Sequence, residues 1–269
     1  MISGYFAVNS IKKGFKDFLS GKVIQLLLPC FTWGIVWQLL FFLQGEGLTD
    51  FEQILHYFIF NYWFLKCLFC CLLIYYVSFK YVHSLLLSAV LSLVISYFAP
   101  FNSSILYPFF LLGSFLHQYE HKYIHHIGFI TLISFVLFIS LNCLLEADAN
   151  RWKYEYWSNN GYSILTAMAG CVFIFGSFSF FRNFIQKTPL LRRIAELGIY
   201  TLGIYILQRF ILEDFLTYIV CLDSCPFVLA NFMINPILSA CVLFVCIWII
   251  ERIEKNKIAC LLFLGKIKV

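Results

Sequence analysis

The chain has 269 residues, of which 62% are hydrophobic and only 12% are charged, and its formal net charge is +5. A soluble domain carries about 25% charged residues, so this composition excludes a protein whose whole surface faces water. The basic residues are dispersed between apolar runs, which excludes a nucleic-acid-binding domain with a basic face. We therefore predict an all-α, polytopic membrane protein that is embedded in the lipid bilayer.

Charged residues and Gly/Pro clusters divide the sequence into eight apolar segments with the character of membrane-spanning helices. We expect these helices at residues 26–44, 59–79, 84–99, 103–116, 127–145, 162–181, 197–216 and 227–250. Residues 1–11 are also apolar, but as a helix they reach only about 16 Å, roughly half of a bilayer core. The predicted fold is a transmembrane helix bundle of eight full helices plus an N-terminal half helix, in one domain over residues 1–269.

The third and fourth segments are short, and Ala99-Pro100-Phe101-Asn102 predicts a tight turn between them.

Basic residues alternate between the connections in a way that orients the bundle. Four lysines precede the first full helix, at positions 12, 13, 16 and 22, whereas the next connection carries Glu46, Asp50 and Glu52 and no basic residue. Continuing this alternation places 15 of the 19 basic residues on one side and two, Arg151 and Lys153, on the other. Because basic residues favour the cytoplasmic side, we predict a cytoplasmic C-terminal tail.

Three histidines, His117, His121 and His125, recur at every fourth residue. Two histidines on one helical face could bind Zn²⁺, but no carboxylate or cysteine completes a convincing set, although Glu120 is near. We interpret this stretch as a solvated loop and predict no metal site.

Most of the eleven cysteines lie in apolar runs, where they behave as small apolar residues. Cys67, Cys70 and Cys71 resemble a redox or metal motif by spacing alone, and their Leu and Phe neighbours favour a packing role. Cys221 and Cys225 flank a short polar turn, and the sequence leaves open whether they form a disulfide.

Charged residues inside the apolar segments are costly and need a partner or a water-filled cavity. For Lys66 both a functional role and snorkelling to the interface stay open. Arg209 and Glu213 are one helical turn apart and are predicted to pair, and both a structural role and a place in an acceptor-glycan site stay open for them.

Five short patterns occur in a fixed order along the chain. They are Ile2-Ser3-Gly4-Tyr5-Phe6, Leu27-Leu28-Pro29-Cys30-Phe31-Thr32-Trp33, Tyr62-Trp63-Phe64-Leu65, Tyr107-Pro108-Phe109-Phe110-Leu111-Leu112-Gly113 and Leu197-Gly198-Ile199-Tyr200-Thr201-Leu202-Gly203-Ile204-Tyr205. Each pattern alone is weak, but together, in this order and spacing, they resemble the acyltransferase-3 family of bacterial membrane O-acyltransferases. The resemblance covers nearly the whole chain.

This resemblance implies a ten-helix enzyme of the bacterial inner membrane. Such enzymes move an acetyl or similar group from cytoplasmic acyl-CoA, a co-substrate, to a hydroxyl of a cell-surface carbohydrate, and no resident cofactor is expected. Under this interpretation Lys22 and Lys16 are the expected acyl-CoA-binding residues. The expected substrate-pocket residues are Ser3, Gly4, Trp63, Lys66, Tyr205 and Gln208. For the two lysines the alternative is topology and contact with anionic lipid, and for Trp63 it is an interfacial anchor.

The chain departs from the family pattern at three places. The family's first helix carries an Arg and a His that is the proposed base, whereas Ile2-Ser3-Gly4-Tyr5-Phe6 belongs to the second helix. We therefore expect a member shortened at its N-terminus, with DNA upstream of Met1 encoding the first helix. Lys22-Val23-Ile24-Gln25 stands where the family has Arg-x-x-Arg. Gln208 stands where the family often has His, and a neutral amide cannot act as a base.

These departures leave the catalytic residue unknown and the enzymatic status of the chain open. We expect the 269 residues alone not to transfer acyl groups at an enzymatic rate. The alternative functions are a non-catalytic membrane protein that binds a glycan or a partner, and a transporter. A transporter would favour charged or broken helices in two related halves, and Lys66 and Arg209 show no such relation.

Overall fold

A computed structural model describes residues 1–43, 62–82, 84–144, 157–208 and 234–266. All regular structure in these ranges is helical, which confirms the predicted all-α class. The chain divides into two compact units. Unit 1 comprises Met1–Gly14 and Cys70–Arg193, and unit 2 comprises Phe15–Phe69 and Ile194–Val269. Helix α5 (Trp63–Tyr81) contributes residues to both units, as does α12 (Pro189–Glu196).

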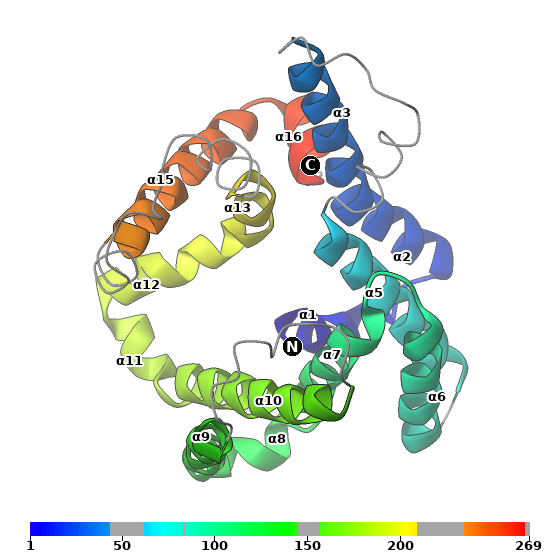
Figure 1. Cartoon of the computed structure of the whole chain (residues 1–269), viewed down its shortest axis with the longest axis vertical. Helices are drawn as coiled ribbons and strands as arrows, with labels where there is room; N and C mark the ends of the chain where they lie inside the picture. Colours follow the sequence, from blue (N-terminus) through cyan, green and yellow to red (C-terminus); the bar gives the residue numbers. More distant parts are fainter. Residues whose placement is uncertain (44–61, 83, 145–156, 209–233, 267–269) are drawn as a thin grey trace. The chain divides into compact units, whose positions relative to one another are not determined.

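Unit 1 is built from pairs of helices that are close along the sequence or brought together from its two segments. Its other elements are α1 (Ile2–Ala7), η1 (Val8–Ser10), α6 (Leu85–Phe98), α7 (Ser103–Gln118), α8 (Glu120–Tyr123), η3 (Ile124–His126), α9 (Ile127–Leu144), α10 (Trp157–Phe180) and α11 (Arg182–Lys187). Helix α9 packs along α10, and α7 packs against both α1 and α6 (Figure 1).

Unit 2 joins the beginning of α5 to helices from both ends of the described chain. It contains α2 (Phe15–Lys22), the π-helical turn η2 (Val23–Leu27), α3 (Leu28–Leu43), η4 (Leu197–Tyr200), α13 (Thr201–Gln208), α15 (Asn235–Ile253) and α16 (Lys257–Leu264). Helix α16 packs on α3, and α13 packs on α15 (Figure 1).

Five stretches of helix in the described residues are long and apolar enough to cross a membrane. They are Phe15–Leu39, Trp63–Tyr81, Glu120–Asn142, Ser163–Phe180 and Pro236–Ile253. Each overlaps one of the eight predicted segments. The remaining three predicted segments correspond to shorter helices: α6 with 14 residues, α7 with 16, and α13, which is described only as far as Gln208. At 1.5 Å per residue, α6 covers about 21 Å, less than a full hydrocarbon core.

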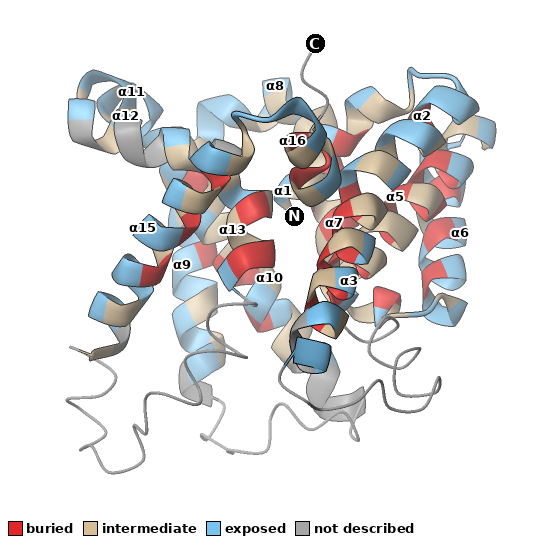
Figure 2. Ribbon diagram, turned by 90° about the horizontal axis from the view of Figure 1, so that it is seen from above, coloured by how far each residue is buried: buried red, intermediate tan, exposed pale blue. Residues whose placement is uncertain are grey.

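Large apolar residues are exposed on several helices, on which exposed residues are coloured pale blue in Figure 2. On α9, Phe129, Leu132 and Val136 are 64%, 59% and 55% exposed, and α6 and α15 carry similar residues. Contiguous apolar surface of this kind is rare on soluble monomers and is the surface that a helix presents to lipid. The exposed faces therefore agree with the integral membrane class that the composition predicts.

The tight turn predicted between the third and fourth segments is confirmed. Helix α6 ends at Phe98, and Phe101 and Asn102 adopt left-handed backbone conformations with φ of 62° and 56° before α7 begins. Asparagine tolerates this conformation better than most residues, which fits Asn102 at the last position before the helix.

Several sequence predictions lie outside the described residues. They concern the acidic connection of Glu46, Asp50 and Glu52, the basic residues Arg151 and Lys153, the pair Arg209 and Glu213, and a disulfide between Cys221 and Cys225.

Candidate functional site

Two of the family-like patterns meet in unit 1, where α1 crosses α7 without side chains between the backbones. A Cβ atom added to Gly4 would lie 1.8 Å from the Phe110 carbonyl oxygen, and one added to Gly113 would lie 1.9 Å from the Met1 carbonyl oxygen. Small residues of this kind let helices approach closely in lipid, where apolar burial gives little driving force for association. Gly4, predicted in the substrate pocket, is thus a packing position, and its pocket role stays a prediction. The neighbouring Ser3 is half-buried.

Next to this crossing, Tyr5 connects α1 to the corner between α7 and α8. Its hydroxyl donates a hydrogen bond of 2.6 Å to Oε2 of Glu120, and its ring lies edge-on to His117 with 4.6 Å between ring centroids. The Nδ1 atom of His117 is buried and has no hydrogen-bond partner among the described residues. Tyr5 also contacts Phe175 of α10 at 5.5 Å. This contact network was not predicted, because no local pattern signals a bond between residues 115 positions apart.

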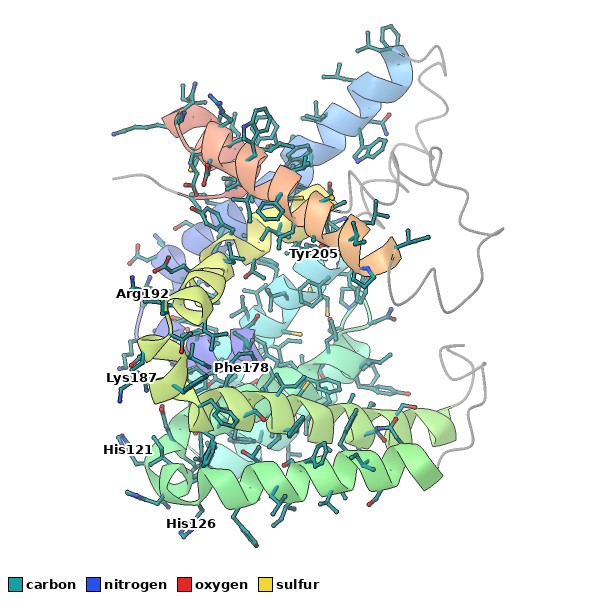
Figure 3. The ribbon with its side chains drawn as sticks, turned by 90° about the vertical axis from the view of Figure 1, so that its left-hand side faces the viewer. His121, His126, Phe178, Lys187, Arg192 and Tyr205 are labelled. Carbon is teal, nitrogen blue, oxygen red and sulfur yellow. The ribbon has the colours of Figure 1, made fainter. Side chains whose placement is uncertain are left out.

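The three regularly spaced histidines differ in how far they are buried. His117 lies in the last turn of α7 and is half-buried, so the prediction of a solvated loop is wrong at this position. His121 and His125 are exposed on α8 and η3, as predicted. His121, His126, Lys187 and Arg192 lie toward one end of the bundle in Figure 3.

Lys13 and Lys80, two of the lysines that the predicted topology places on the same side, lie close together in unit 1. The Lys80 ammonium, from the end of α5, donates to the Lys13 carbonyl at 2.7 Å and to the Tyr76 hydroxyl at 2.6 Å. Tyr76 donates to the same Lys13 carbonyl at 2.8 Å. The residues after α1 and the end of α5 thus share one end of the unit.

In unit 2, the predicted donor-binding residue Lys22 ends α2, directly before a turn of π-helix. Its ammonium donates to Oε1 of Gln25 at 2.9 Å. The wider turn has a cause in the sequence, because Pro29 lacks an N–H for the Gln25 carbonyl four residues earlier and its ring would clash there. The Leu28 N–H instead donates to the Val23 carbonyl, five residues back. Turns of this type occur often at functional sites.

The short helix α16 packs against this π-helical turn. Trp33 of α3 donates its indole N–H to the Phe263 carbonyl at 3.2 Å. Gly265 comes directly after the helix and has a left-handed conformation with φ of 61°. It lies so close to the π-helical turn that an added Cβ would be 2.5 Å from the Ile24 carbonyl oxygen and 2.6 Å from that of Gln25. Both the conformation and the close approach require glycine at this position.

Helix α16 was missed by sequence reasoning, which treated residues 255–269 only as a basic tail. Eight residues are too few to register as a membrane span, but the sequence carries cap signals at both ends. The Asn256 side chain accepts hydrogen bonds from the N–H groups of Ile258 and Ala259, and Gly265 closes the helix. Between these caps Cys260 and Leu264 are almost completely buried.

The other predicted pocket residues of unit 2 lie on α5 and α13. Tyr205 contacts Phe64 with 5.4 Å between ring centroids, which brings these two helices together. Lys66 is half-buried on α5. Trp63 and Gln208 are exposed. Unit 2 therefore brings Tyr205 to the helix that carries Trp63 and Lys66, while their role as substrate-pocket residues stays a prediction.

The second predicted donor-binding residue, Lys16, is exposed on α2 and lies in the same helix as Lys22. Among the described residues no group of three or more His, Cys, Asp or Glu side chains is placed to hold a metal ion. The π-helical turn offers an electrostatic feature, which is the Lys22 ammonium group held by the Gln25 amide at the end of α2.

Comparison with known proteins gives a match to one family. The model of the acyltransferase-3 family, described as an acyltransferase domain, matches residues 1–251. No curated protein and no solved structure gives a significant match to the chain.

Proposed function

Because the chain belongs to the acyltransferase-3 family, we propose that it is a membrane-bound O-acyltransferase acting on a cell-surface carbohydrate. The family match over residues 1–251, together with five helices in the described part of the chain that are fit to cross a membrane, is the observation that carries this proposal. In the proposed reaction an acetyl or related acyl group moves from acyl-CoA to a carbohydrate hydroxyl. The thioester C–S bond breaks, an ester C–O bond forms, and the hydroxyl proton leaves through a general base while CoA departs as the thiol.

We place acyl-CoA at the end of unit 2 that carries Lys22. A CoA donor is an anion with several phosphate charges, which an ammonium group on an exposed helix end attracts. Lys22 fits this role because its Nζ is held by Gln25 beside the π-helical turn. Lys16, one helix turn and a half earlier, adds positive charge to the same helix.

The proposed location is the bacterial inner membrane, with the basic end of each unit in the cytoplasm, where acyl-CoA is made. The excess of Lys and Arg in alternate connections supports this orientation. Reporter fusions at residues 46–52, 118–124 and 255–269 should read outside, inside and inside. A tail that reads outside would overturn the orientation and with it the proposed place of the donor.

The function is tested in cells of the source organism. Deleting the gene together with the DNA upstream of Met1 should remove ester-linked acyl groups from a surface carbohydrate, and a plasmid copy of the same DNA should restore them. A Lys22→Ala copy should restore them only in part, and Lys257→Ala, which removes an exposed lysine elsewhere in unit 2, should restore them fully. Unchanged surface acylation after deletion would contradict the proposal and favour a non-catalytic or transport role.

A binding experiment separates donor recognition from turnover. The purified 269-residue chain in lipid nanodiscs should bind labelled acetyl-CoA, and unlabelled CoA should compete. Turnover is measured on the same sample with candidate glycans. Binding without turnover would support the donor site alone, whereas absence of binding would contradict it.

A further inference from the structure

We infer that Lys266, which lies beyond the family-matched region, is a second donor-binding residue and acts with Lys22 on the phosphates of the acyl donor. This inference rests on the function proposed above. Its basis is the position of α16, which brings a cation from the far end of the chain to the π-helical turn.

The first step is proximity. Gly265 lies against the backbone of Ile24 and Gln25, and an added Cβ at Gly265 would be 2.8 Å from the Gln25 Cα. Lys266 is the next residue in the chain, and consecutive Cα atoms are about 3.8 Å apart. The Lys22 ammonium is bonded to the Gln25 side chain. The Lys266 backbone therefore follows directly on a contact with Gln25, the residue whose side chain accepts the hydrogen bond from Lys22.

The second step is the present environment of the Lys266 ammonium. It forms an ion pair of 2.7 Å with Oε1 of Glu254, and it lies 5.4 Å from the centre of the Tyr200 ring. The two charged side chains are 32% and 23% exposed, so water reaches the pair. Solvent screens such a partly exposed pair, so a phosphate group of the donor can compete with the carboxylate for the ammonium.

The third step is the surrounding sequence. Tyr200 belongs to the Leu197–Tyr205 pattern, and Gly203 of the same pattern contacts Leu264 of α16. The segment that carries Lys266 is thus packed on family-like elements although it lies outside the matched residues 1–251. Lys22 is the one cation of Lys22-Val23-Ile24-Gln25, and Lys266 supplies a second positive charge to the turn where Gln25 is neutral.

The test is equilibrium binding of labelled acetyl-CoA to the 269-residue chain in nanodiscs. Lys266→Ala should weaken binding about three- to tenfold, the range for losing one partly exposed charged contact. Lys266→Arg should retain most of the affinity. The matched control is Lys257→Ala, which removes an exposed lysine from the first turn of the same helix and should leave the affinity unchanged.

Glu254→Gln separates a binding role from a structural one. If Lys266 binds the donor, removing its competing carboxylate frees the ammonium and should strengthen binding, whereas Lys266→Ala weakens it. If the ion pair only holds α16 in place, both variants should weaken binding and lower thermal stability together. A parallel loss in the two variants would overturn the inference.

The unmodified chain and Lys266→Ala complete the design. Full wild-type affinity in Lys266→Ala would refute the role of Lys266 and leave the proposed function intact. Failure of the wild-type chain to bind acetyl-CoA would instead refute the proposed donor and this inference with it.

Discussion

Replacing Gly4 with alanine tests the contact between α1 and α7. The new Cβ would lie 1.8 Å from the Phe110 carbonyl oxygen and 2.7 Å from its carbon, both of them backbone atoms that cannot rotate away. Restoring ordinary van der Waals contact requires the two helices to separate by about 1.5 Å. Helix α1 cannot move by this amount and keep the 2.6 Å hydrogen bond between Tyr5 and Glu120.

The expected cost follows from these two effects. Overpacking of a tight contact typically costs about 1–3 kcal/mol, and loss of a hydrogen bond to a charged group costs about 1.5–3 kcal/mol. A single displacement of α1 relieves the clash and breaks the hydrogen bond, so the two costs do not add in full. We expect Gly4→Ala to lower the free energy of unfolding by about 2–4 kcal/mol. The matched control is Gly161→Ala in α10, where an added Cβ meets nothing within 4 Å. There the higher helix propensity of alanine should stabilise by up to about 1 kcal/mol.

The assay is heating of the detergent-solubilised protein, followed by size-exclusion chromatography of what remains folded. Gly4→Ala should lose its monodisperse peak at a clearly lower temperature than the wild type, and Gly161→Ala should not. Gly113→Ala, whose Cβ would meet the Met1 carbonyl at 1.9 Å, should resemble Gly4→Ala. The double variant should cost less than the two single effects combined, because one displacement of α1 accommodates both methyl groups. Equal stability of Gly4→Ala and Gly161→Ala would refute the close crossing of α1 and α7.

Three further predictions use the same heating assay. Tyr5→Phe removes the donor to the Glu120 carboxylate and should destabilise by about 1.5–3 kcal/mol, with no effect expected if the hydrogen bond is absent. Trp33→Phe removes the indole N–H that reaches the Phe263 carbonyl and should cost about 1 kcal/mol or more, so a neutral result would contradict the docking of α16 on α3. Asn256→Ala removes the N-terminal cap of α16 and should cost about 1 kcal/mol, whereas Asn256→Asp should retain most of the stability.

The long helices could be predicted from the sequence because each is an apolar run ended by charge. The segment predicted at 59–79 corresponds to α5 at Trp63–Tyr81, and that predicted at 127–145 corresponds to α9 at Ile127–Leu144. Such runs carry their own boundary signals, since a charged residue in the bilayer core is costly. The short segments followed too, since 84–99 corresponds to α6 at Leu85–Phe98 and 103–116 to α7 at Ser103–Gln118.

The site residues were less predictable because their partners are distant in the sequence. Nothing local to Tyr5 points to Glu120, and nothing local to Trp33 points to Phe263. The π-helical turn did have a local signal in Pro29, whose missing N–H disturbs the helix around Gln25. Helix α16 had signals in its two caps. Both were missed by reasoning that looked for membrane spans and charge bias alone.

The family-like patterns of this chain combine two kinds of position, and the structure separates them. Gly4 and Gly113 belong to the first kind, since each occupies a place where a Cβ would meet a backbone carbonyl of another helix. Lys22 belongs to the second kind, because its half-buried side chain ends in an ammonium group that bonds the Gln25 side chain. Helices in lipid depend on close backbone contact for their association, so a substitution of the first kind displaces a helix and lowers activity indirectly. Loss of acyl transfer in a Gly4 variant would therefore say nothing about substrate binding unless its stability were unchanged. Loss in a stable Lys22 variant would report on the donor.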